Sequence, residues 1–379
     1  MYDLWFHRVM CADDVRVSAY AKAIRAEVKP DDVVLDVGCG VGVLSVLAAK
    51  AGARRVYAVD LDDSVHYARR VVVENGVGDR VDVFRGRIQD VELPEKPTLI
   101  VADVRGGLPW GVGAAPAWNA ARAKAAPHVR TIPTHDVVMA EPVTSDTLDA
   151  RIRRLAPIEG VSLAALRPSL ALGWERPDPD VRPLAPAGAV AEVRYDAPLV
   201  DEFDGTVTFE TTRPVSVDGF RVGFEAHLAP GVSYRSFGEG AARVYGSLLL
   251  PTRERLAWRP ETPLALRVSR RRVSGGPGLL WSVRLGDAEG AWQGEMLEQV
   301  LSLDVLRASL PGHVSKPDAV DEVRRVALEA LRDGRTVAQA VSRALSALPA
   351  GTPREEVEEE IVELSRRRQA RTVRRIEDA

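Results

Sequence analysis

The stretch that decides the fold is VVLDVGCGVG, residues 33–42, in which an apolar run ends in Asp36 and three glycines follow at alternate positions. The apolar run predicts a buried strand, and the residues after it predict a helix. Glycines let the chain turn sharply and let a ligand approach backbone N–H groups closely. A strand, a glycine loop and a helix in this order predict a ligand held at the turn.

Strand-like and helix-like stretches alternate around this loop. Strands are expected at VVLDV, RVYAVD, RVDVFRG and PTLIVADV. Helices are expected at GVLSVLAAKAGA and SVHYARRVVVENG, each closed by a glycine or Asn-Gly stop. Strands that alternate with helices pair in parallel. We therefore predict a Rossmann-like α/β domain over residues 1–145.

Residues 146–310 change to an alternation of period two. The alternating apolar residues are Val207 and Phe209; Phe220, Val222 and Phe224; Leu264, Leu266 and Val268; and Trp281, Val283 and Leu285. Turn sequences such as VDGF and SGGPG separate these runs. The pattern is typical of antiparallel strands with one buried face, so we predict a β-barrel or β-sandwich domain.

Residues 311–379 carry three helical patterns, AVDEVRRVALEALRDG, TVAQAVSRALSAL and PREEVEEEIVELSRRRQ. Gly334 ends the first pattern and Pro353 lies just inside the third, which are common positions for these residues. The acidic and basic runs of the third pattern are expected to form a solvated helix face. We predict a small helical domain here.

The composition excludes several classes of protein. The formal charge of −3 over 379 residues gives no general attraction to nucleic acid or to an anionic membrane. No apolar stretch has the length of a membrane span, and the N-terminus lacks the features of a signal peptide. Two cysteines and six scattered histidines show no metal-ligand spacing. We expect a cytoplasmic protein without metal, nucleic-acid partner or membrane partner.

The glycine loop has an acidic partner in Asp60, which ends the next strand in VYAVD and can hold the two ribose hydroxyls of an adenosine. The loop spacing is G-x-G-x-G, with an aspartate two residues before the first glycine. This looks like motif I of the class I S-adenosylmethionine (SAM)-dependent methyltransferases. A domain that binds NAD, or that has lost its ligand, is the alternative. The cofactor residues that the resemblance implies are Asp36, Gly38, Gly40, Gly42, Asp60 and Leu61, with Ile88 packed on the adenine and Gln89 near its edge.

The order of segments narrows the resemblance. A short helical segment, HRVMCADDVRVSAY, precedes the loop, and a β-rich region follows the α/β domain. This order resembles the protein arginine methyltransferase family, most clearly over residues 7–105. The resemblance implies that Met10 lies near the sulfonium and that Arg16 binds the SAM carboxylate. It also implies a homodimer, in which the SAM domain and the barrel domain pair head to tail.

Two departures from that family concern the methyl acceptor. The family clamps a guanidinium between two glutamates. Here Asp103 falls on the first glutamate, and the place of the second lies near Val112, where no acid occurs. The family's Thr-His-Trp motif is replaced by Arg243, Val244 and Tyr245. One short carboxylate holds a planar guanidinium poorly, so we predict that the acceptor is not an arginine side chain.

An aliphatic amine would suit this site better. It becomes a nucleophile once it loses a proton, which in water happens near pH 10. We expect Asp103 to bind the ammonium and accept a proton, with Glu141 or Glu225 as a second acid. Tyr2 and Trp110 would wall the methyl pocket. The alternatives are a rim carboxylate for each glutamate and simple loop packing for Trp110.

The helical tail bears on the substrate. DGRTVAQAVSRAL and REEVEEEIVELSRRR resemble the helical part of PqqD-like domains, which capture leader peptides in ribosomal peptide natural-product pathways. A tail for dimerisation or packing is the alternative. The resemblance implies a peptide substrate, as in daptide-type pathways, whose methyltransferases dimethylate a peptide amine.

The leading prediction is therefore a SAM-dependent N-methyltransferase that acts on a peptide amine. One alternative is an enzyme that methylates arginine or another guanidino group. A second alternative, from a different class, is a non-catalytic adaptor that keeps the SAM-binding fold and binds a peptide partner.

Overall fold

The computed structural model of the 379-residue chain describes residues 4–109, 114–154, 157–164, 180–200, 202–273, 276–286, 294–295 and 337–347, with positions 354, 357, 358 and 361. Contacts divide the chain into a larger unit, Met1–Val305, and a smaller one, Leu306–Ala379. Among the described helices, none is long and apolar enough to cross a membrane.

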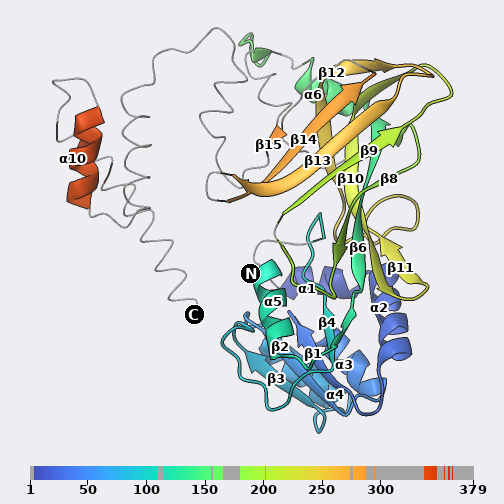
Figure 1. The fold of residues 1–379 in the computed structure, drawn as a ribbon, viewed down its shortest axis with the longest axis vertical. Helices are drawn as coiled ribbons and strands as arrows, with labels where there is room; N and C mark the ends of the chain where they lie inside the picture. Colours follow the sequence, from blue (N-terminus) through green and yellow to red (C-terminus); the bar gives the residue numbers. More distant parts are fainter. Residues whose placement is uncertain are drawn as a thin grey trace. The chain divides into compact units, whose positions relative to one another are not determined.

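The larger unit contains a five-stranded parallel sheet of order β3-β2-β1-β4-β5. Figure 1 labels the first four of these strands beside helices α1 to α5. Its strands are β1 (Val33–Val37), β2 (Arg55–Asp60), β3 (Val81–Arg85), β4 (Leu99–Ala102) and β5 (Arg130–Ile132). Its helices are α1 (Leu4–Cys11), α2 (Asp14–Glu27), α3 (Val43–Lys50), α4 (Val65–Glu74) and α5 (Ala114–Lys124). The predicted α/β fold is confirmed, and the expected strands and helices fall at these positions.

Helices cover both faces of this sheet. Alternate residues of β1 therefore pack into different cores. Val34 packs in a core with α2, α3 and α4. Val33, Leu35 and Val37 pack with α5. The strand order reverses between β1 and β4, and ligands of such sheets bind in the crevice at the carboxyl ends of the strands beside this reversal. The glycine loop and Asp103 both follow strands at that edge.

Two antiparallel sheets follow, as the period-two pattern predicts. The first holds β6 (His135–Thr144), β7 (Arg182–Pro183), β8 (Gly188–Arg194), β10 (Val215–Ala229), β11 (Val232–Arg235) and β12 (Leu248–Trp258). The second holds β9 (Phe203–Phe209), β13 (Leu264–Val273), β14 (Gly276–Leu285) and β15 (Gly294–Glu295). Phe220, Val222 and Trp281 from both sheets share one core. Strand β6 pairs with β10 and β8, so the chain enters the antiparallel sheet before residue 145.

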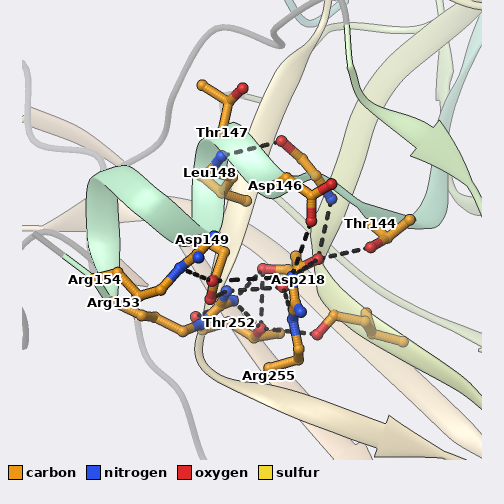
Figure 2. A network of polar contacts seen from close by, with 12 residues as sticks. Thr144, Asp146, Thr147, Leu148, Asp149, Arg153, Arg154, Asp218, Thr252 and Arg255 are labelled. Atoms are coloured by element: carbon orange, nitrogen blue, oxygen red, sulfur yellow. Dashed lines mark hydrogen bonds and ion pairs between the residues drawn. The ribbon is translucent and has the colours of Figure 1, made fainter.

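A buried polar cluster ties the end of β6 to the antiparallel strands, beside the short helix α6 (Asp146–Ile152) (Figure 2). Asp218 is fully buried and accepts hydrogen bonds from Arg153, Arg255 and Thr144, each at 2.8 Å. The Thr252 hydroxyl donates to the Asp218 carbonyl oxygen at 2.9 Å and accepts from Arg153 at 3.1 Å. This cluster is structural, because its charges satisfy one another within the fold.

Replacing Thr252 with valine is expected to lower the free energy of unfolding by about 1–2 kcal/mol, because a buried donor and acceptor are removed while their partners stay. Urea unfolding would measure the loss. The matched control is Thr211→Val, since within the described residues the Thr211 hydroxyl bonds to the exposed Arg213 backbone in its turn. Equal losses in both variants would contradict a buried role for Thr252.

The smaller unit contains α10 (Val337–Ala347), within the second predicted helical pattern. Its residues Ala340, Val341 and Ala344 are buried, as are the helical positions Val357 and Ile361 of the third pattern. The first predicted helix of this region lies outside the described residues. A helical domain over residues 311–379 therefore stays a prediction.

Candidate active site

The glycine loop joins β1 to α3 in a conformation that requires glycine. Gly38, Gly40 and Gly42 have φ values of +72°, +55° and +85°, in the left-handed region that residues with a Cβ rarely adopt. A Cβ on Gly40 would lie 2.9 Å from the His7 ring, so α1 packs directly against the loop. The predicted glycine-dependent turn is confirmed.

Asp60 stands at the end of β2 and is bound to this loop. Its Oδ2 accepts the Gly40 backbone N–H at 2.8 Å, and its Oδ1 accepts the Asp62 N–H at 2.9 Å. The side chain is only partly buried. Each carboxylate oxygen can accept a further hydrogen bond. The geometry therefore fits a ligand with neighbouring hydroxyl groups, as the sequence predicts.

Asp36 lies beneath the loop with 1% of its surface exposed. The Ser45 hydroxyl donates to its Oδ2 at 2.5 Å, whereas its buried Oδ1 has no hydrogen-bond partner within the described part of the chain. Burial raises the pKa of Asp36 to about 7, and the nearby charge of Asp60 adds to the rise. A buried carboxylate with an unused oxygen fits a site for a cationic group.

Replacing Asp36 with asparagine should remove a pH dependence of stability. A carboxyl whose pKa is raised on folding contributes stability below its unfolded pKa near 3.8, and this contribution is lost as the pH rises through about 7. In that window the wild-type free energy of unfolding should fall by up to roughly 1 kcal/mol per pH unit relative to the variant. Urea unfolding from pH 4.5 to 8 would measure this slope, and the exposed Asp63→Asn should keep the wild-type profile.

The other predicted cofactor residues divide by burial. Ile88 is 3% exposed and belongs to the core on the α5 side of the sheet. Gln89 is exposed, and Leu61, directly after Asp60, is 56% exposed.

Tyr2 and Trp110, the predicted walls of the methyl pocket, lie outside the described residues. Within the described residues, no group of three or more histidine, cysteine or acidic side chains could hold a metal ion.

Arg16 points from α2 to the end of β4. Its Nε donates to Oδ2 of Asp103 in a short contact and to the Tyr245 hydroxyl at 3.0 Å. Its Nη1 donates to the carbonyl oxygen of Met10, a half-buried residue, at 3.2 Å. The structure thus brings together four residues that the sequence analysis named separately, Arg16, Met10, Asp103 and Tyr245.

The segment in place of the family's Thr-His-Trp motif also reaches this site. Asp13, the N-cap of α2, accepts the backbone N–H groups of Arg243 and Val244 at 2.6 and 2.9 Å. The next residue, Tyr245, donates its hydroxyl to Asp103 in a short contact. Two distant parts of the chain therefore converge on one carboxylate.

The Asp103 side chain is 3% exposed and has both oxygens engaged by the chain's own side chains. Oδ2 accepts from Arg16 and Tyr245, and Oδ1 accepts from Arg105 at 3.1 Å. Burial raises the pKa of Asp103, but Arg16 and Arg105 more than offset this and hold the pKa below its ordinary value. These bonds make Asp103 a weak base and a fixed anchor for two arginines.

Sequence reasoning missed Arg105, two residues after Asp103. Its side chain is 1% exposed and forms a bidentate ion pair with Asp136, with both N–O distances at 2.7 Å. Nothing in the local sequence distinguishes this arginine from the exposed ones. Its burial follows from strands β6 and β10, which pack over it from far along the chain.

The two candidate second acids have arginine partners on the antiparallel sheet. Glu141 accepts from Arg221 Nε at 2.6 Å, across the β6–β10 pair. Glu225 accepts from Arg235 at 2.8 Å, with His227 at 3.6 Å. Their charges are therefore already compensated.

Comparisons with known proteins agree with this geometry. A family model described as ribosomal protein L11 methyltransferase (PrmA) matches residues 19–105. The chain is 35% identical over 166 residues to probable protein arginine N-methyltransferase 6.1 of Oryza sativa subsp. indica, covering 43% of this chain and 44% of that protein. It is 45% identical over 104 residues to protein arginine N-methyltransferase 2 of Dictyostelium discoideum, covering 27% and 20%. The chain thus spans less than half the length of these curated relatives.

Two solved structures extend the likeness to the antiparallel sheets. One is the Trypanosoma brucei PRMT1 enzyme–prozyme heterotetrameric complex with AdoHcy, with a TM-score of 0.70, 20% identity and coverage of 76% of this chain and 96% of the other. The other is Arabidopsis thaliana protein arginine methyltransferase 10, with a TM-score of 0.63, 19% identity and coverage of 77% and 97%. The chain therefore has the fold of the protein arginine methyltransferases across its α/β and antiparallel sheets.

Proposed function

We propose that the chain is a SAM-dependent methyltransferase that binds SAM at the glycine loop between β1 and α3. One observation carries the proposal: the Asp60 carboxylate is fixed at the end of β2 by the Gly40 and Asp62 N–H groups, beside a loop whose glycines adopt left-handed conformations. This is the arrangement that holds an adenosine ribose in nucleotide-binding α/β folds. The similarity to methyltransferases supports the same reading.

The surrounding residues fit the remaining parts of this cofactor. None of the hydrogen bonds described for the chain uses Nη2 of Arg16, so this nitrogen is available for a carboxylate. The unused Oδ1 of Asp36 is available for an ammonium group. In this proposal Ile88 provides an apolar surface for the adenine, and the exposed Gln89 and Leu61 are the further residues on the adenosine side. Bound SAM would supply an electrophilic methyl group on a sulfonium.

The acceptor that best fits the site is an amine of a peptide rather than an arginine side chain. Arg16 and Arg105 are balanced by Asp103 and Asp136, so this cluster carries no net charge. A guanidinium stays protonated at neutral pH and would enter without a counter-charge. An amine reacts as the neutral species and needs no such counter-charge. The chain's role is then to position the amine and exclude water.

Calorimetric titration with S-adenosylhomocysteine, followed by mass spectrometry of methyl transfer, tests the proposal. The acceptors are amine-bearing peptides and, in parallel, arginine-bearing peptides. Binding with transfer to the amine supports the proposal. Transfer to arginine would establish the second candidate, which the names of the curated relatives favour. Binding of a peptide without transfer to either would establish the adaptor.

The substrate's presentation is a separate proposal, which rests on the helical patterns of residues 311–379. In it, the helical tail captures the leader of a ribosomal peptide precursor, as in daptide-type pathways. Deleting residues 316–379 should then reduce turnover of a leader-bearing peptide far more than turnover of a short amine. Equal reductions would reject leader capture and favour a tail that serves packing or dimerisation.

A further inference from the structure

Arg105 has an unusually complete set of partners for a side chain of the protein itself. Its Nε and Nη2 donate to the two oxygens of Asp136, and its Nη1 donates to the Tyr20 hydroxyl at 2.6 Å. The same Nη1 lies 3.1 Å from Asp103 and 3.4 Å from the Tyr234 hydroxyl. Every nitrogen of the guanidinium is therefore hydrogen-bonded.

Aromatic rings complete the enclosure. The guanidinium carbon lies 5.6 Å from the Phe224 ring centre and 5.9 Å from the centres of Tyr195 and Tyr234. A bidentate carboxylate, further oxygen acceptors and aromatic faces are the features with which proteins bind guanidinium groups. The enclosure has the chemistry of a guanidinium-binding site, and the chain itself supplies the occupant.

The walls of this enclosure are held by bonds that do not involve Arg105. The Tyr195 hydroxyl donates to Asp136 Oδ2 at 2.7 Å, and the Tyr20 hydroxyl donates to the Ala102 carbonyl oxygen at 2.8 Å. Tyr234 stacks on Tyr245 with ring centres 6.1 Å apart. Because the walls come from α2, β6, β10, β11 and the end of β8, the site should persist when the Arg105 side chain is shortened.

We propose that Arg105 is a specificity-determining residue, which occupies a built guanidinium site beside Asp103 and thereby closes it to arginine acceptors. It stands two residues after Asp103, in the segment where the resemblance places the acceptor-binding loop. While Arg105 is present, both aspartates are compensated. A second guanidinium would meet no free acid, whereas a neutral amine is not excluded. The specificity part rests on the proposed methyltransferase function, but the binding site does not.

Chemical rescue tests the binding site without any methyl transfer. Arg105→Ala should have a clearly lower melting temperature than the wild type, because Asp136 and Asp103 lose a buried counter-charge. Millimolar guanidinium chloride should raise this temperature in a saturable way by several degrees, compared with equal sodium chloride, because it binds the folded state. Arg267→Ala, which removes an arginine from an exposed pair with Asp204, should show no such rise.

An equal rise in melting temperature for Arg105→Ala and Arg267→Ala, or in guanidinium chloride and sodium chloride, would contradict a guanidinium-binding site. Arg105 would then be a member of an ordinary structural ion pair. If Arg105→Ala does not fold in sodium chloride, the yield of folded protein after refolding is measured in place of the melting temperature. A higher yield in guanidinium chloride than in sodium chloride supports the binding site, and equal yields oppose it. Arg105→Lys is the second variant. It keeps the charge without the planar fork and should be less stable than the wild type and insensitive to guanidinium. A rise for the lysine variant would overturn the proposal.

Acceptor preference tests the specificity part. Arg105→Met should shift the ratio of kcat/KM for an arginine peptide over an amine peptide upward by roughly tenfold or more, since it leaves Asp136 without its arginine and releases Oδ1 of Asp103. An unchanged ratio in an active variant would reject the specificity role. Rescue without transfer to any acceptor would reject the proposed function and leave the binding site standing. Methyl transfer by the wild type without rescue of Arg105→Ala would support the proposed function and reject the guanidinium-binding site.

Discussion

Replacing Asp60 with alanine is expected to weaken binding of S-adenosylhomocysteine by roughly a hundredfold, about 3 kcal/mol, through the loss of two hydrogen bonds from hydroxyls to a carboxylate. A second effect adds to this loss. Asp60 also fixes the Gly40 and Asp62 N–H groups, so its removal loosens the loop that forms the site. Isothermal titration calorimetry would measure the change in Kd.

The matched control is Asp63→Ala, three residues farther along the chain. The Asp63 side chain is 68% exposed and pairs with Arg85 at 2.9 Å on the surface. Its removal alters the local charge by the same amount without touching the loop, so the affinity should stay within about twofold of the wild type. An Asp60→Ala protein that folds and binds as tightly as Asp63→Ala would refute the assignment of the ribose site.

The parts of the fold that the sequence predicts well are those set by local rules. Strands β1 and β2 are short buried valine-rich runs that end near Asp36 and Asp60, and each is followed by a helix with a recognisable stop. The glycine loop could be predicted because a left-handed backbone favours one residue type. The antiparallel strands show an alternation that requires one buried face, as Phe220 and Val222 confirm.

The charge pairing of the site could not be predicted in the same way. Arg16, Asp103, Arg105, Asp136 and Tyr245 lie on elements up to 229 residues apart, and their contacts depend on how the two parts of the larger unit pack. The sequence identified Asp103 as an acid near the acceptor. It could not show that two arginines and a tyrosine already use both carboxylate oxygens. The pairing of Glu141 with Arg221 likewise depends on the register between β6 and β10, which the sequence does not show.

Replacing Asp103 with asparagine should produce the largest loss of stability, about 3–5 kcal/mol in the free energy of unfolding at pH 7, because a buried charge pair loses one partner. Arg16 and Arg105 would then be left with the single charge of Asp136, which pairs with Arg105 and not with Arg16. Turnover should fall with it, because the orientation of Arg16 depends on Asp103. Urea unfolding and a methyl-transfer assay would measure the two effects.

The pH dependence identifies the cause of this loss. The pKa of Asp103 is held below its ordinary value, so its contribution is present above the unfolded pKa near 3.8 and is lost as the pH falls through the folded pKa. The difference between wild type and Asp103→Asn should therefore be constant from pH 6 to 8 and shrink in strong acid. Asp204→Asn, which breaks the exposed pair with Arg267, should cost less than about 1 kcal/mol. If Asp103→Asn lowers the free energy of unfolding no more than Asp204→Asn does, Asp103 does not anchor the two arginines. The charge balance that supports an amine acceptor would then be wrong.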